Sequence, residues 1–114
     1  MKLTRIYTGD DGHSHFEEVD LVEDPTQRRS TTETRPATHF GFGITTAMLP
    51  MQEWHHAPRR QLVAVLSGAL EIECADGKRV FGTGDCFIAD DLAGRGHQTS
   101  DIEGPVRLLY VHLP

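Results

Sequence analysis

Short runs of apolar residues, each ended by a glycine- or aspartate-containing turn, dominate the second half of this 114-residue chain. In residues 70–74, Leu-Glu-Ile-Glu-Cys, apolar side chains alternate with glutamates, as in a strand that buries one face. Asp76-Gly77 follows as a hairpin signal, because glycine accepts the positive φ that a tight turn requires. No stretch has helical periodicity over three turns, so the pattern predicts an all-β fold.

Residues 62–66, Leu-Val-Ala-Val-Leu, are apolar on both faces of the expected strand. Such a strand is covered on both sides, by a barrel interior on one and by a second sheet or subunit on the other. Many short strands without a covering helix imply a β-sandwich or a closed barrel. The core residues that we expect are Val63, Val65, Leu70, Ile72 and Ile88. The outer face, Leu62, Ala64 and Leu66, favours a homodimer, with the N-terminal strand as a candidate to cross between subunits.

The length predicts a single domain over residues 1–114. The N-terminal part, 1–37, contains two expected strands and a polar, unpatterned surface loop at 23–37. The strands that we expect lie at 2–7, 14–22, 38–50, 61–67, 69–75, 79–81, 85–89 and 105–113.

Composition narrows the classes of partner. The net charge is −6, and no Lys/Arg-rich run offers a surface for nucleic acid or an anionic membrane. No stretch approaches the roughly 18 apolar residues of a membrane span. The first residues lack the apolar core of a secretory signal, so we expect a cytoplasmic protein. Cys74 and Cys86 fall in expected strands, which favours buried thiols over a disulfide.

Two spaced motifs carry the functional information. The first runs from His55-His56 to Gln61 and on to Gly68, seven residues further. The second begins at Gly84-Asp85 and ends in Gly94-Arg-Gly-His97. Their order and spacing resemble the cupins, whose first motif has two histidines one residue apart, then a glutamate and a glycine. The cupin second motif reads Gly-Asp, a short strand, Pro and Gly-x-x-His.

This sequence departs from the cupin pattern at identifiable positions. Gln61 replaces the glutamate, Asp90 stands where the family has proline, and the turn before His97 is two residues longer. The resemblance covers about residues 50–113 and implies an antiparallel jelly-roll β-barrel. The stretches 54–61 and 90–97 also resemble a subgroup of small bacterial cupins.

The resemblance further implies a divalent transition metal, such as Zn, Fe, Mn or Ni, between the first motif and His97. One first-motif histidine survives in either register: His56 with Trp54 in place of its partner, or His55 with Ala57 in place of its partner. The candidate metal ligands are therefore His56 (or His55), Gln61 and His97. A set without a carboxylate should hold a dication more weakly, because charge attraction contributes much of the affinity. The alternative is a metal-free pocket whose polar residues bind each other or a ligand.

The same region supplies candidate substrate-binding residues. A guanidinium from Arg59 or Arg60 at the rim would clamp a carboxylate or phosphate, and the alternative is an ion pair with Asp90 or Asp91. Trp54 would stack on a planar ligand, or else belong to the core or an interface.

Two functions follow from the candidate pocket. In the first, the chain is a small-molecule enzyme of the isomerase, lyase or oxygenase type, with His97 and His55 as acid/base groups or metal ligands. In the second, it is a non-catalytic domain that binds or senses a small ligand with a degraded metal site. Fold resemblance does not choose between them.

Overall fold

The structure, a computed structural model, describes residues 1–24, 26, 28, 31–45 and 52–114. Its strands are β1 (Lys2–Thr8), β2 (Ser14–Asp20), β3 (Glu23–Asp24), β4 (Thr31–Thr32), β5 (His39–Ile44), β6 (Gln61–Cys74), β7 (Gly77–Gly82), β8 (Cys86–Asp90) and β9 (Gln98–His112). None of the described residues forms a helix, and hence none belongs to an apolar helix that could cross a bilayer.

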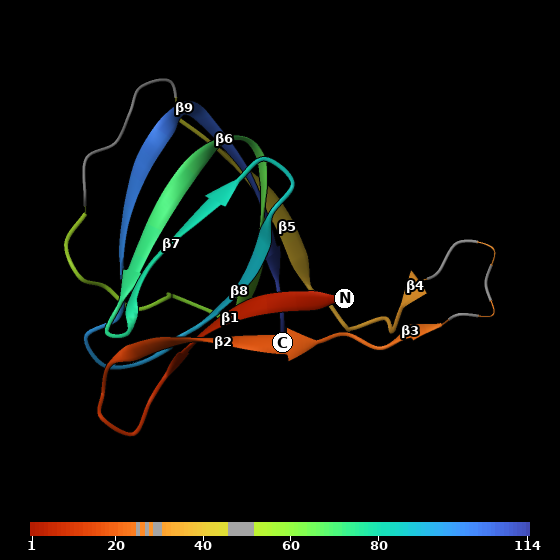
Figure 1. Cartoon of the computed structure of the whole chain (residues 1–114), viewed down its shortest axis with the longest axis horizontal. Coiled ribbons are helices and arrows are strands. Elements are labelled where there is room, and N and C mark those ends of the chain that lie inside the picture. Colours follow the sequence, from red (N-terminus) through yellow and green to blue (C-terminus); the bar gives the residue numbers. More distant parts are fainter. Residues whose placement is uncertain (25, 27, 29–30, 46–51) are drawn as a thin grey trace.

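One curved sheet contains all the longer strands, in the order β2-β1-β8-β6-β9-β5, with β7 paired to the far half of β6 (Figure 1). The two long strands β6 and β9 run side by side and bend together. The bend falls where their register shifts, between Val65 and Leu70, and includes Gly68 at a φ of +76°. It wraps the sheet around the core, and the predicted all-β fold is confirmed.

The N-terminal hairpin departs from the expected all-antiparallel arrangement. β1 is antiparallel to β2 but parallel to β8, where Ile6 lies opposite Ala89. Ile6 is fully buried at this position, so the pairing stabilises the core. Side-chain alternation shows which face of a strand is buried but not the direction of its neighbour, which is why the prediction was wrong here.

Two further expectations about strand boundaries were wrong. β9 begins at Gln98, seven residues before the predicted start at 105, because its polar first half and the Gly104-Pro105 pair look like a loop in the sequence. The predicted loop at 23–37 contains β3 and β4, which pair through two residues each. Strands this short have no alternation to detect. Residues 46–50 of the expected strand at 38–50 lie outside the described residues.

All five predicted core residues are buried, but not on one face. Val63, Val65, Leu70 and Ile72 belong to the core cluster. Ile88 is also buried, at 4% exposed, yet it points to the other side of β8 from the cluster members Phe87 and Ala89. The prediction that these five residues are buried is therefore confirmed, although Ile88 lies on the outer face of the sheet.

The outer face of the sheet is apolar across several strands. One cross-strand row joins Phe40, Val111, Leu62 and Ile88. The adjacent row joins Phe42, Leu109, Ala64 and Cys86. At the β5 end, Phe40 and Phe42 are 72% and 62% exposed. Single exposed apolar residues are ordinary, but two adjoining rows make a patch of the kind that marks an interaction surface.

Cys74 and Cys86 are both free thiols, as expected, but Cys86 is only half-buried. Cys74 is buried in the core, and burial raises the pKa of its thiol to about 12. A thiol that stays protonated is a poor nucleophile and a poor metal ligand, so Cys74 is a packing residue.

Candidate functional site

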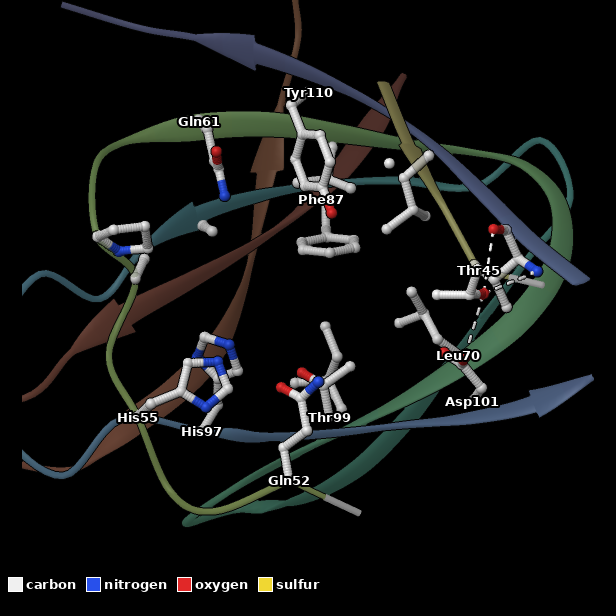
Figure 2. Close-up of a pocket in the computed structure, with 18 of the residues that line it drawn as sticks. Thr45, Gln52, His55, Gln61, Leu70, Phe87, His97, Thr99, Asp101 and Tyr110 are labelled. Carbon is white, nitrogen blue, oxygen red and sulfur yellow. Dashed lines mark hydrogen bonds between the residues drawn. The ribbon is translucent and has the colours of Figure 1, made fainter. Parts of the chain in front are cut away.

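A cavity of about 370 Å³ lies inside the curve of the sheet. Its floor is apolar and comes from the core cluster, and its polar lining consists of Thr45, Gln52, His55, Gln61, His97, Thr99, Asp101 and Tyr110. Figure 2 shows the rings of His55 and His97 together at one end, with Gln61 and Tyr110 pointing inward from the opposite side. An apolar pocket with a few converging polar groups is the usual form of a small-molecule site.

The mouth of the cavity is built by a segment without strand structure. Residues 52–57 run beside the start of β9, and His55 and His97 exchange two backbone hydrogen bonds, of 3.0 and 2.8 Å. The amide of Gln52 donates to the carbonyl of Thr99, and that of Ala57 donates to the carbonyl of Asp91. This ladder fixes the first-motif histidines relative to the second motif.

Glycine at position 96 allows this close approach. Gly96 has a φ of +83°, and a Cβ placed on it would lie 1.9 Å from the carbonyl oxygen of His55. Gly94, at a φ of +75°, approaches the carbonyl oxygen of Gly12 in the same way. The Gly-x-Gly-His sequence is thus required by two backbone crossings, one to the mouth segment and one to the N-terminal hairpin.

A buried carboxylate holds His97. Nδ1 of His97 donates to Oδ2 of Asp91 over 2.6 Å, and the hydroxyl of Ser14 donates to the same oxygen over 2.7 Å. His97 is 7% exposed, and Asp91 and Ser14 are fully buried. Because a carboxylate accepts the Nδ1 proton, the neutral His97 ring keeps a lone pair on Nε2. The side chain is thereby fixed in both orientation and tautomer.

His55 is arranged in a similar way, but at the exposed mouth. Its Nδ1 donates to the backbone carbonyl of Glu53 over 2.8 Å, which again leaves the Nε2 lone pair. The centroids of the His55 and His97 rings are 4.7 Å apart, with the rings inclined at 55°. Two imidazoles with available Nε2 atoms therefore lie side by side at one end of the cavity.

Across the cavity, Gln61 and Tyr110 supply further polar groups. Gln61 is half-buried at the start of β6, opposite Ala89 on β8. Tyr110 is also half-buried, and its ring packs against Gly43, where a Cβ would lie 2.7 Å from a ring carbon. Burial and then the nearby Asp101 charge raise the pKa of the Tyr110 phenol. The phenol is therefore neutral at physiological pH and can donate a hydrogen bond.

Four candidate residues lie outside the described lining of the cavity. His56 is exposed, with its Nδ1 directed to the carbonyl of Ala57. Arg59 is exposed as well, and Arg60 lies 3.5 Å from a carboxylate oxygen of Asp90, as in the alternative pairing considered above. The fourth is Trp54, whose ring stacks against the guanidinium of Arg95, 3.8 Å from the ring centroid.

The residues that line the cavity do not fit a three-ligand metal centre. Of the candidate ligands, His55, His97 and Gln61 surround the cavity, and His56 does not. Within the described ranges, no group of three or more His, Cys, Asp or Glu side chains is placed to hold a metal ion. Two neutral imidazoles and an amide also lack the negative charge that favours a bound dication.

Two residues of the site were missed by sequence reasoning. Asp91 was considered only as an ion-pair partner for arginine, although an aspartate six residues before the motif histidine is a usable signal. Ser14 lies 77 residues from Asp91 in the sequence, and no local pattern connects the two. The β1–β8 pairing and the contacts of the N-terminal hairpin with residues 93–95 bring them together.

No protein-family model matches the sequence, and no curated protein is similar to it in sequence. The chain is similar in structure to the cupin domain of Schizosaccharomyces pombe Cnp3, at 16% identity and a TM-score of 0.45, covering 98% of this chain and 83% of that one. It is also similar to a putative ethanolamine utilization protein Q from Salmonella typhimurium LT2, at 18% identity and a TM-score of 0.40, covering 100% and 96%. Both likenesses concern the fold alone.

Proposed function

We propose that the chain is a small-molecule enzyme in which His97, held by Asp91, transfers a proton to or from a ligand in the cavity. The buried Asp91–His97 hydrogen bond of 2.6 Å carries this proposal. A carboxylate that fixes the Nδ1–H tautomer leaves Nε2 as a base, and the resulting imidazolium is stabilised by the adjacent negative charge.

The remaining polar groups suit proton transfer next to an oxygen of the ligand. The Tyr110 hydroxyl and the Gln61 amide can donate hydrogen bonds to a carbonyl oxygen as negative charge develops on it. His97 can return the proton at a second position, or pass it to the neighbouring Nε2 of His55, which then returns it. This arrangement favours an isomerase or lyase reaction that begins with proton abstraction, and it assigns no step to a metal.

Solvent-exchange measurement tests the proposal without a known substrate. The protein is incubated in D₂O with a panel of small carbonyl compounds, and deuterium incorporation next to the carbonyl is followed by NMR. We expect incorporation with at least one compound, reduced about 100-fold or more in His97→Gln. The exposed neighbour His56→Gln is the matched control and should retain the rate. Equal rates in wild type and His97→Gln would contradict the proposal.

A second candidate is a non-catalytic domain that binds or senses a ligand. It is favoured by the mainly apolar floor of the cavity and by the incomplete set of metal ligands. The two candidates differ in the exchange experiment. A compound that perturbs the amide resonances of Thr99 and Tyr110 but never incorporates deuterium would favour binding alone.

We also propose that the protein is a homodimer through the outer apolar rows, which include Leu62 and Ala64. Covering the exposed Phe40 and Phe42 gives the free energy for pairing, at about 25 cal/mol for each Å² of apolar surface. Light scattering should give a dimer mass at tens of micromolar. Phe42→Glu should shift it to monomer, and Val80→Glu, an exposed apolar position on β7, should not.

A further inference from the structure

The charge of the cavity lining restricts the ligands that it can take. Neither lysine nor arginine occurs among the described residues that line the cavity. Asp101 is the acidic residue of the described lining, and the other lining residues include no fixed cation.

Two arginines near the mouth, Arg60 and Arg95, have other partners, and Arg59 is exposed and outside the described lining. Arg60 lies beside Asp90, which also accepts a hydrogen bond from Arg5 on β1. Arg95 stacks on Trp54. An anion entering the cavity would therefore lose water without gaining a counter-ion, which is unfavourable in an apolar site. The net charge of −6 also disfavours the approach of an anion, at longer range.

A group that already lies in the cavity shows the same preference. The pKa of the Tyr110 phenol is raised by burial and by the charge of Asp101, so the neutral form is favoured there. A carboxylic acid placed beside that phenol would experience the same two effects. Its pKa would rise, and binding would select its protonated form.

The position of the hydrogen-bonding groups determines where a neutral ligand can be polar. His55 and His97 lie at one end of the cavity, and Gln61 and Tyr110 point inward across from them (Figure 2). The lining also includes apolar side chains such as Phe87 and Leu108. A ligand with an apolar body, and with a hydroxyl group at the histidine end or a carbonyl oxygen facing Gln61 and Tyr110, matches this distribution.

We propose that the cavity selects an uncharged, partly apolar small molecule with a hydroxyl group at the His55–His97 end or a carbonyl oxygen facing Gln61 and Tyr110, and that it discriminates against carboxylates and phosphates. This inference rests on the proposed function, since it names the substrate class of the same site. It also reverses the expectation of an anionic substrate held by Arg59 or Arg60.

The test compares matched probes that differ only in charge: hexanamide with hexanoate, and benzamide with benzoate. Dissociation constants are measured at pH 8 from the amide resonances of His97, Thr99 and Tyr110. We expect each amide to bind at least about tenfold more tightly than its carboxylate. Carboxylates that bind as tightly as the amides would overturn the inference while leaving the cavity as a ligand site.

Two lysine variants sharpen the result. Thr99→Lys adds a cation to the lining and should improve carboxylate binding about tenfold or more. Ser100→Lys, the adjacent residue on β9, adds the same charge on the other face of the strand and should change nothing. If Thr99→Lys does not fold, the wild-type comparison alone decides. Absence of cavity shifts with every probe at millimolar concentration would overturn both this inference and the proposed function.

Discussion

Two histidine–carboxylate pairs lie within the same molecule in opposite environments. His97 and Asp91 are 2.6 Å apart, with side chains 9% and 0% exposed. His15 and Asp11 are 2.9 Å apart in the N-terminal hairpin, with side chains 23% and 50% exposed. The chemical groups are the same, so the difference between the pairs comes from burial and from the neighbours of each carboxylate.

Burial holds one pair in a fixed geometry and leaves the other as a weak surface contact. The Ser14 hydroxyl donates to the same Asp91 oxygen as His97 Nδ1, so the carboxylate and the His97 ring are held in one orientation. Asp11 is surrounded by water, and solvent screening makes such a pair worth little. His15 also lies 3.7 Å from Asp76, so it has two alternative partners where His97 has one.

The largest expected effect is the loss of the buried carboxylate. Asp91→Ala leaves the Ser14 hydroxyl and the His97 Nδ1–H buried without an acceptor, which should lower the free energy of unfolding by about 4 kcal/mol. Urea denaturation at pH 8 measures this loss in the free energy of unfolding. Asp11→Ala is the matched control and should be nearly neutral there. Similar losses in both variants would remove the distinction between the pairs.

The next effect concerns the turn that presents His97. Gly96→Ala places a Cβ against the His55 carbonyl and should cost about 3 kcal/mol of stability. Gly84→Ala is the control: its φ of +92° is similar, but its Cβ meets no described atom within 4 Å, so about 1 kcal/mol is expected. Urea denaturation gives both values. We also expect Gly96→Ala alone to change the ring-proton shifts of His55, which lies against His97.

A smaller loss of stability is expected when one of the two hydrogen-bond donors to Asp91 is removed. Ser14→Ala removes one hydrogen bond and keeps the other, so we expect a loss of about 1 kcal/mol in the free energy of unfolding. Ser67→Ala, whose hydroxyl makes only a 3.5 Å contact with the Pro105 carbonyl, is the control. In Ser14→Ala the ¹⁵N shifts of His97 should still report the Nδ1–H tautomer. A changed tautomer would mean that Ser14, and not Asp91 alone, fixes the ring.

The smallest effect is the pH dependence of the exposed pair. The hydrogen bond between His15 and Asp11 raises the pKa of His15 above 6.5. The pKa of Asp11 is lowered below 3.8, mainly by the hydrogen bond from the backbone N–H of His13 and then by the one from His15. The stability that protonated His15 contributes is fully present below pH 6.5 and is lost as the pH rises through its raised pKa. The Asp11 contribution is complete above pH 3.8 and is lost as pH falls through the lowered pKa.

The urea midpoints of wild type and His15→Gln should therefore differ most between these two values, from about pH 4 to 6.5, and converge on either side. Asp20→Asn, an exposed change at the end of β2, provides the control for lost surface charge. A difference that keeps growing above pH 8 would contradict this account.

Sequence reasoning located the fold better than the site. Alternation at 70–74 and the continuous apolar run at 62–66 predict strand faces directly, because burial follows the period of the backbone. The spacing from Gln61 to His97 also pointed to residues that surround one cavity. The choice between His55 and His56 depends on the backbone ladder with His97, which no residue pattern encodes.

Charge and register explain what the sequence could not show. Arg59 and Arg60 are adjacent to a first-motif residue in sequence, yet a one-residue step along a strand or mouth segment reverses the direction of a side chain. Ser14 reaches Asp91 because β1 pairs in parallel with β8. Parallel pairing between distant segments leaves no local signature.

The parallel pairing of β1 with β8 has a consequence for the folding kinetics. Thr4 and Phe87, the first partners in that pairing, are separated by most of the chain, and closing so long a loop is entropically costly and slow. During synthesis β8 emerges long after the N-terminal hairpin, which waits without its parallel partner. The Ser14–Asp91–His97 arrangement should therefore form late, together with the pairing of β1 and β8 that completes the sheet.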